Sequence, residues 1–281
     1  MISPFSKFPK LCLVAIALFS SSSYAEQRII SAGSAVTEII EELGASDKLV
    51  AIDVTSAQPE GKELPVVGYH RQLSAEGLLA LTPSHLIGSD AMGPATTLTV
   101  LKNSGVEVDQ VNSDSSVQGL YQRIDELSEL TGTQSNAQAL KAKVTQQVDD
   151  LNANQPKGTP LKALFLIIHE GRPSNVAGDK TTPNALIELA GAVNPAKAKL
   201  ESYKPLSNES LIEMQPDVIL VSGRSTLDNL STLLDTLPVL AATPAGKNKR
   251  FISIDGKALV GGLGLKTLSE AQRLNKLLYP N

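Results

Sequence analysis

The chain has 281 residues, of which 42% are hydrophobic and 19% charged, so it can pack one large domain or two modest ones. A formal net charge of −4, without any block of Lys and Arg, argues against the basic surface that nucleic-acid binders use. The 4% aromatic content, with no Trp, also disfavours a stacking platform for single strands. We therefore expect no nucleic acid among the partners.

The first segment, residues 1–25, has the order of a secretory signal peptide. Two lysines precede an apolar run over residues 11–19, and small residues that end at Ala25 resemble a cleavage site. The run has about half the length that spans a bilayer, which favours cleavage over an uncleaved anchor. Cys12, the only cysteine, leaves with this segment, so disulfides and Cys-ligated metals are excluded. An acidic, cysteine-free chain exported in this way fits the periplasm.

The next segment, residues 26–133, alternates between two hydrophobic periods. Short apolar, β-branched runs predict strands, and helix-period stretches between them predict helices. The predicted strands are 28–31, 49–54, 86–89 and 106–108, and the predicted helices are 35–43 and 97–103. Because this alternation is typical of parallel sheets with crossover helices, we expect a first α/β lobe.

A single long helix interrupts the alternation. Apolar side chains recur at steps of three and four between Ala137 and Leu151, which places them on one face of a helix over residues 135–154. Helix-breaking residues at 155–160 end it. We expect this segment, taken as residues 134–155, to link two lobes.

Residues 156–281 repeat the alternating pattern. The predicted strands are 164–168, 218–221 and 250–254, and the predicted helices are 183–190, 227–237 and 265–278. The predicted fold class is therefore α/β, with two Rossmann-like lobes that have parallel sheets and are joined by one long backbone helix.

An internal repeat relates the two lobes. Leu73–Pro83 and Leu206–Pro216 share Leu, Ser, Glu, Leu and Pro at a constant offset of 133, and each precedes a predicted strand. Glu76 and Glu209 fall in the first turn of a helix in each repeat, where the helix dipole favours an anion. That role alone would explain both acids. Two equivalent exposed carboxylates would also suit a partner with pseudo-twofold symmetry.

The segment Tyr69-His70-Arg71 places a phenol, an imidazole and a guanidinium on a loop directly before the Glu76 helix. Loops at the ends of strands and helices are where α/β lobes bind ligands. A tyrosinate oxygen suits ferric iron and is a known haem ligand, and a cation such as Arg71 stabilises the phenolate or grips a carboxylate. An ordinary surface loop with a half-buried Tyr is the alternative.

His169 ends the predicted strand 164–168, at the edge where a ligand cleft is expected. Its imidazole suits a second axial ligand or a hydrogen-bond donor, or it pairs with the adjacent Glu170. Arg172 and Arg224 also follow predicted strands and suit an anionic ligand. The three histidines lack zinc-ligand spacing, and the chain has no Gly-x-Ser-x-Gly, Walker A or dinucleotide motif, which disfavours an enzyme.

Four segments of the chain resemble the periplasmic haem-binding proteins of bacterial haem ABC importers. The segments are 28–39, 67–77, 177–187 and 189–192. These proteins belong to the helical-backbone (class III) substrate-binding proteins, which also include siderophore and cobalamin binders. The resemblance extends over the whole mature chain. It implies Tyr69 as an axial ligand, His169 as a second one and Arg71 as a propionate partner, with Glu76 and Glu209 docking onto arginines of the permease dimer.

The expected function is therefore capture of ferric haem in the cleft between the lobes and delivery to an inner-membrane ABC permease, with an outer-membrane haem receptor as an indirect partner. Haem is then a transported ligand, and the protein is not an enzyme. His70 could compete with Tyr69 as a ligand. The alternatives are a ferric siderophore or cobalamin binder of the same class, a haem carrier without a transporter, and an exported two-lobed enzyme.

Overall fold

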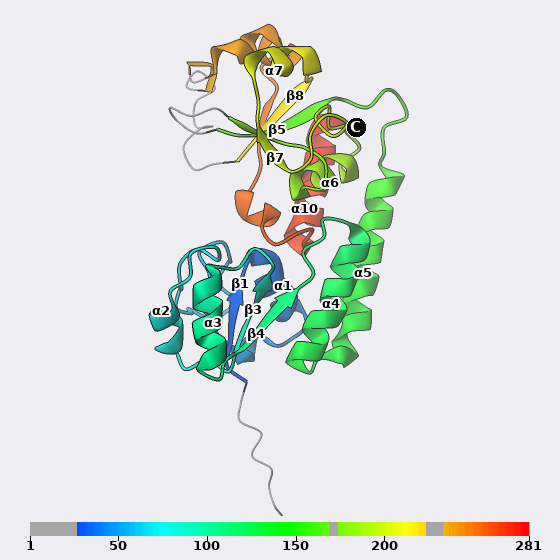
Figure 1. The fold of residues 1–281 in the computed structure, drawn as a ribbon. Coiled ribbons are helices and arrows are strands. Elements are labelled where there is room, and N and C mark those ends of the chain that lie inside the picture. Colours follow the sequence, from blue (N-terminus) through cyan, green and yellow to red (C-terminus); the bar gives the residue numbers. More distant parts are fainter. Residues whose placement is uncertain (1–26, 169–173, 223–232, 236, 281) are drawn as a thin grey trace, which may run out of the picture.

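The computed structural model describes residues 27–168, 174–222, 233–235 and 237–280, and these form two α/β lobes stacked end to end (Figure 1). The predicted signal segment, residues 1–25, lies outside the described residues. Within the described part of the chain, no helix has both the length and the apolar character needed to cross a membrane.

The first lobe is built on a four-stranded parallel sheet with the order β2-β1-β3-β4. Its strands are β1 (Ile29–Ala32), β2 (Leu49–Ile52), β3 (His85–Ser89) and β4 (Glu107–Val111), each overlapping a predicted strand. Its helical elements are α1 (Ser34–Glu42), the short η1 (Ser46–Lys48), α2 (Ala75–Leu79), α3 (Ala95–Asn103) and α4 (Val117–Thr131). Helices α2 and α3 cover one face of the sheet, and α1 and α4 cover the other (Figure 1).

Helix α4 is the one long element of this lobe that the sequence did not predict. Ser116 caps its first turn by accepting a hydrogen bond from the Gly119 N–H, and Gly132 ends it in the left-handed conformation, at φ 68°. Its apolar stripe includes Leu120 and Leu127, but a fully buried Arg123 lies between them. A charged residue on the apolar face weakens the helical hydrophobic pattern, which is why the helix was missed.

The second lobe has a five-stranded sheet with the order β7-β6-β5-β8-β9. Strands β5 (Ala163–Ile167), β8 (Val218–Val221) and β9 (Phe251–Ser253) pair in parallel and confirm the predicted ones. The short strands β6 (Asn175–Ala177) and β7 (Tyr203–Pro205) add an antiparallel edge that the sequence did not predict.

Helices again cover both faces of the second sheet. One face carries α6 (Thr182–Leu189) and α10 (Leu265–Leu278), and the other carries α7 (Asn208–Met214), η2 (Pro238–Ala242) and α9 (Pro244–Lys247). Helices α6 and α10 were predicted at nearly the same bounds. Most of the predicted helix 227–237 lies outside the described residues.

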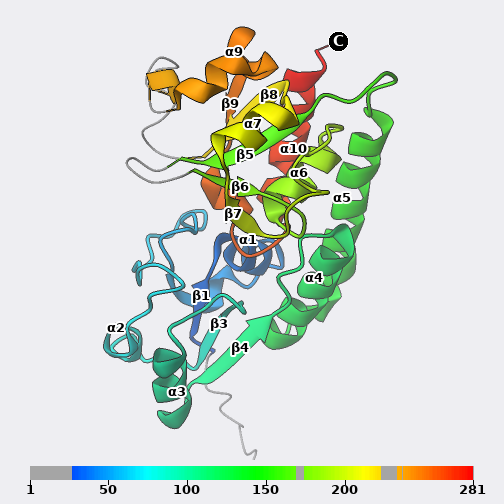
Figure 2. The same ribbon diagram turned by 45° about the horizontal axis from the view of Figure 1, so that its top comes forward.

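Helix α5 (Gln134–Ala153) confirms the predicted long helix and runs along the side of both lobes (Figures 1 and 2). It packs against α4 of the first lobe and against α6 and α10 of the second. One hydrophobic core is therefore continuous through the molecule, from Ile39 on α1 through Val144 on α5 to Leu268 on α10. Because opening the lobes would disrupt this shared core, it limits their relative motion.

A second connection is the chain segment 256–266, which contains η3 (Gly256–Leu259) and leads into α10. It returns to the first lobe and is held there by buried polar side chains. Arg123 donates to the Leu263 carbonyl at 2.6 Å, and the Glu38 carboxyl accepts from the Leu265 N–H at 2.6 Å. Burial raises the pKa of Glu38 from 4.5 to about 7, although the N–H groups at the start of α10 and the charges of Lys266 and Arg123 oppose the change.

Candidate functional site

A cleft of about 490 Å³ lies between the lobes, at the carboxyl ends of the parallel strands of both sheets. This is where open α/β sheets bind ligands. The first lobe contributes Tyr69, His70 and Arg71 and the segments that follow β3 and β4. The second lobe contributes Phe165, Tyr203 and the segment 259–262. The structure therefore brings the predicted Tyr69 loop to the cleft.

The loop that carries Tyr69 is fixed by backbone hydrogen bonds on both sides. The Val54 N–H donates to the Gly68 carbonyl at 2.9 Å, and the Gly93 N–H donates to the His70 carbonyl at 2.9 Å. Gly68 has φ 94°, a conformation that side-chain-bearing residues rarely adopt, so it allows the bend before Tyr69. Tyr69 itself is 41% exposed. The loop thus holds an accessible phenol at a defined place in the cleft.

His70 lies beside Tyr69 but differs from it in environment. It is only 2% exposed, and its Nδ1 is 3.2 Å from Oδ2 of the fully buried Asp53. Burial alone would raise the pKa of Asp53, but hydrogen bonds from His70, Ser56 and Thr55 hold it below its usual value of 3.8. Asp53 is therefore a charged acceptor that fixes the His70 ring.

Tyr203 on β7 is a cleft residue that sequence analysis missed. It lies on the wall opposite the Tyr69 loop and is 38% exposed. Burial in the cleft raises the pKa of Tyr203 to about 12, and the Tyr69 phenol acts in the same direction while Arg71 opposes it. Tyr203 is therefore a neutral phenol that offers a hydrogen-bond donor and an aromatic ring. The one feature of the sequence that could have drawn attention to Tyr203 is that tyrosine is rare in this chain, which has five.

Of the other predicted ligand residues, only Arg71 can be placed. It lines the cleft beside Tyr69. His169, Arg172 and Arg224 lie outside the described residues. Lys180, which was not predicted, adds a cation to the cleft wall and is 3.0 Å from the Glu201 carboxylate.

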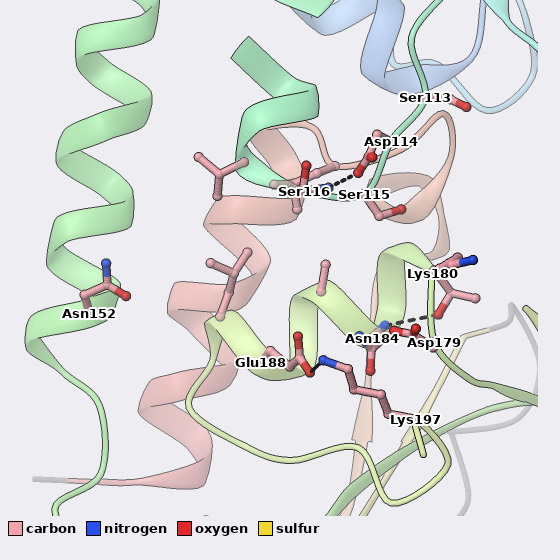
Figure 3. Close-up of a pocket in the computed structure, with 15 residues that line it drawn as sticks. Ser113, Asp114, Ser115, Ser116, Asn152, Asp179, Lys180, Asn184, Glu188 and Lys197 are labelled. Atoms are coloured by element: carbon pink, nitrogen blue, oxygen red, sulfur yellow. Dashed lines mark hydrogen bonds and ion pairs between the residues drawn. The ribbon is translucent and has the colours of Figure 1, made fainter. Parts of the chain in front are cut away.

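A second cavity of about 550 Å³ lies on the α5 side of the lobe contact (Figure 3). The hydroxyls of Ser115 and Thr182, 3.1 Å apart, join the lobes where the two cavities adjoin. Figure 3 shows Ser116 at the start of α4 on one side and the ion pair of Glu188 with Lys197 on the other. Of the predicted ligand residues that the structure describes, neither Tyr69 nor Arg71 lines this cavity.

Glu76 and Glu209 occupy matching positions on α2 and α7. In each helix the preceding Ser accepts a hydrogen bond from the N–H three residues on, at 3.4 Å for Ser74 and 3.1 Å for Ser207. Both acids are exposed in the first turn, and neither forms an ion pair with any described residue.

The repeat continues at the ends of these two helices. Thr82 (φ 47°) and Gln215 (φ 45°) both have left-handed backbones, and a proline follows each. This conformation is uncommon for residues other than Gly. Its recurrence at the offset of 133 shows that the repeat seen in the sequence is also a repeat of backbone structure.

Two α/β lobes, a long connecting helix and a cleft at the carboxyl ends of both sheets define a substrate-binding protein of the helical-backbone class. Residues 29–258 match the family model described as periplasmic binding protein, and the chain belongs to this family.

Solved structures and curated proteins give the nearer similarities. The periplasmic heme binding protein HutB of Vibrio cholerae is 57% identical with a TM-score of 0.85, over 91% of this chain and 100% of that one. A periplasmic heme binding protein from Pseudomonas aeruginosa is 35% identical with a TM-score of 0.84, over 91% and 93%. The vitamin B12-binding protein of Vibrio campbellii is 28% identical over 217 residues, which are 76% of this chain and 78% of that protein.

Proposed function

We propose that this protein captures ferric haem in the cleft between its lobes and delivers it to an inner-membrane ABC permease. The observation that carries the proposal is Tyr69, an accessible phenol held in the cleft by a fixed loop. The 57% identity with a protein described as a periplasmic heme binding protein supports the same ligand. In this role the protein binds and releases haem without catalysing a reaction on it.

In this proposal some cleft residues bind the haem iron, and others contact the propionates and the porphyrin ring. The Tyr69 oxygen binds the ferric iron, and Arg71 beside it pairs with a propionate and stabilises the phenolate. Burial of the mostly apolar porphyrin supplies most of the affinity, at roughly 25 cal/mol per Å² before the costs of association. The opposite wall presents the half-buried Ile167 and Leu259 for this contact.

Residues of the second lobe complete the proposed site. His169 is the candidate for a second axial ligand, because it follows strand β5, whose carboxyl end faces the cleft. Arg172 and Arg224 are candidates for the second propionate. Tyr203, which lines the second-lobe wall, is a candidate hydrogen-bond donor to the ligand.

The exposed acids Glu76 and Glu209 form the proposed docking surface for the permease. They lie on equivalent helices of the two lobes, so together they suit the two arginine-bearing subunits of a dimeric permease. The periplasm is the proposed compartment, which residues 1–25 would reach as a cleaved signal peptide. An outer-membrane receptor would then supply haem indirectly.

Cobalamin is the second candidate ligand, because the curated relatives at 26–28% identity are described as vitamin B12-binding proteins. Equilibrium titrations of the purified protein with ferric haem and with cyanocobalamin distinguish the two. We expect saturable binding of haem and none of cyanocobalamin at the same concentrations. Saturable binding of cyanocobalamin alone would contradict the haem proposal and leave the family assignment unchanged.

A further inference from the structure

The proposed function leaves one buried pair of the cleft without a role. His70 directly follows Tyr69, lines the cleft and is 2% exposed, and its partner Asp53 is fully buried. Burying a carboxylate and an imidazole is costly unless both are hydrogen-bonded. A buried pair directly beside Tyr69 is therefore a candidate for a role in the site.

The pair belongs to a chain of polar side chains that continues into the lobe. Asp53 accepts hydrogen bonds from Thr55 at 2.8 Å and Ser56 at 2.8 Å, in addition to its contact with His70. The Ser56 hydroxyl is in turn 2.6 Å from that of Thr37, at the base of α1. The Asp53 carboxylate is therefore held by hydrogen bonds within the first lobe, and it in turn fixes the orientation of the His70 ring.

The His70 ring contacts Tyr69 directly. The two ring centroids are 4.3 Å apart, and the ring planes are inclined by 58°. Contacts of this tilted kind are favourable between aromatic rings and restrict the rotation of both. Tyr69 is 41% exposed and His70 only 2%, so the buried His70 ring supports the accessible phenol.

We infer that His70 is a positioning residue for Tyr69: Asp53 anchors the imidazole, and the imidazole holds the phenol in the orientation that binds the ligand. This inference rests on the proposed function. Because Asp53 contacts only Nδ1 of His70, the Nε2 atom is free of hydrogen bonds to the described residues, and iron binding through Nε2 is the competing role that the experiment must distinguish from positioning. The gain for the protein is preorganisation, since less side-chain freedom is lost when the ligand binds.

The test uses the full mature protein and His70→Gln, which keeps a donor for Asp53 but removes the ring. We expect His70→Gln to lower the affinity for ferric haem by about tenfold through lost preorganisation, and to shift the tyrosinate-to-iron charge-transfer band. Asp53→Leu removes the anchor and should act in the same direction, while Asp53→Asn keeps an acceptor and should lose less. His85→Gln is the matched control, since His85 lies on β3 and does not line the cleft.

Each outcome decides one claim. Thermal melting without haem identifies any variant that has lost its fold. If His70→Gln binds haem with the affinity and spectrum of the wild type, the positioning role is wrong and the proposed function stands. Loss of a nitrogen-ligand signature in His70→Gln would show that His70 binds iron and would also overturn the inference. If the wild type does not bind haem, the proposed function is wrong, and the inference that rests on it is wrong as well.

Discussion

The two walls of the cleft differ in how firmly they hold their aromatic side chains. Tyr69 lies on a loop with backbone hydrogen bonds on both sides, above the buried pair of His70 and Asp53. Tyr203 lies on β7, an edge strand whose three residues are all exposed and which, among the described strands, pairs only with the equally short β6. The first lobe thus holds its candidate ligand on a fixed loop, and the second holds Tyr203 on a less restrained edge strand.

The difference follows from the architecture of the two sheets. The loop that carries Tyr69 runs beside the parallel strand β2, where the Val67 N–H donates to the Ile52 carbonyl at 2.9 Å. The second lobe places its corresponding wall on an antiparallel ribbon at the edge of the sheet. Edge strands have one unpaired side and therefore less restraint on their side chains.

The junction between the lobes should make stability depend on pH. Because the pKa of Glu38 is raised to about 7, its contribution to stability is complete below pH 4.5 and is lost as the pH rises through 7. At about 1.4 kcal/mol per pKa unit, the loss is about 3 kcal/mol. Glu38→Gln, which stays neutral, should flatten the decrease in melting temperature between pH 5.5 and 8.5. Equal slopes for the variant and the wild type would contradict the role of this carboxyl.

Removing Tyr69, the proposed first iron ligand, should cost more affinity than removing His169, the proposed second one. We expect Tyr69→Ala to weaken ferric haem binding by about 100-fold, and His169→Ala to weaken it less, because the phenolate is the better ligand for ferric iron. Absorption titrations of both variants measure this order. A larger loss in His169→Ala would reverse the proposed roles of the lobes.

The docking acids should behave alike in the two lobes, in contrast to the cleft walls. Glu76→Lys together with Glu209→Lys should weaken binding to the permease by about tenfold or more, since each replaces an attraction by a repulsion, and should spare haem binding. Reversal of Glu63 and Glu129, exposed acids elsewhere on the first lobe that form no ion pair with any described residue, is the charge-matched control. Unchanged haem transport by the double variant would rule out the docking role.

The smallest effect is expected at Tyr203, on the less restrained edge strand. Tyr203→Phe removes one hydrogen-bond donor and keeps the ring, so it should weaken haem binding by less than about tenfold. Isothermal titration with ferric haem measures the change. A loss as large as that of Tyr69→Ala would show that the two walls are equally important and that the comparison is wrong.

Sequence reasoning succeeded where the signal is local. The helix over 134–153 and strand β8 have unbroken hydrophobic periods, and the repeat around Glu76 and Glu209 consists of caps and turns within eleven residues. Tyr69 was found because its neighbours Arg71 and His70 are themselves unusual on one loop.

The features that were missed depend on partners distant in the sequence. Strand β7 exists only because β6 pairs with it, and both have three residues, too few for a periodic signal. Tyr203 on β7 was missed with it. Asp53 showed no signal as the anchor of His70, because the contact joins residues 17 positions apart through the fold of the lobe. Helix α4 was not predicted because Arg123 interrupts its apolar face. The hydrogen bonds that allow this charge to be buried, such as the one to the Leu263 carbonyl, come from residues distant in the sequence.

The most direct test of the account is an absorption titration of the purified mature protein with ferric haem, beside Tyr69→Phe. We predict a saturable Soret change with charge-transfer bands of a tyrosinate complex in the wild type, and loss of those bands in the variant. A flat titration of the wild type, or identical spectra for both proteins, would contradict the claim that Tyr69 binds ferric haem in this cleft.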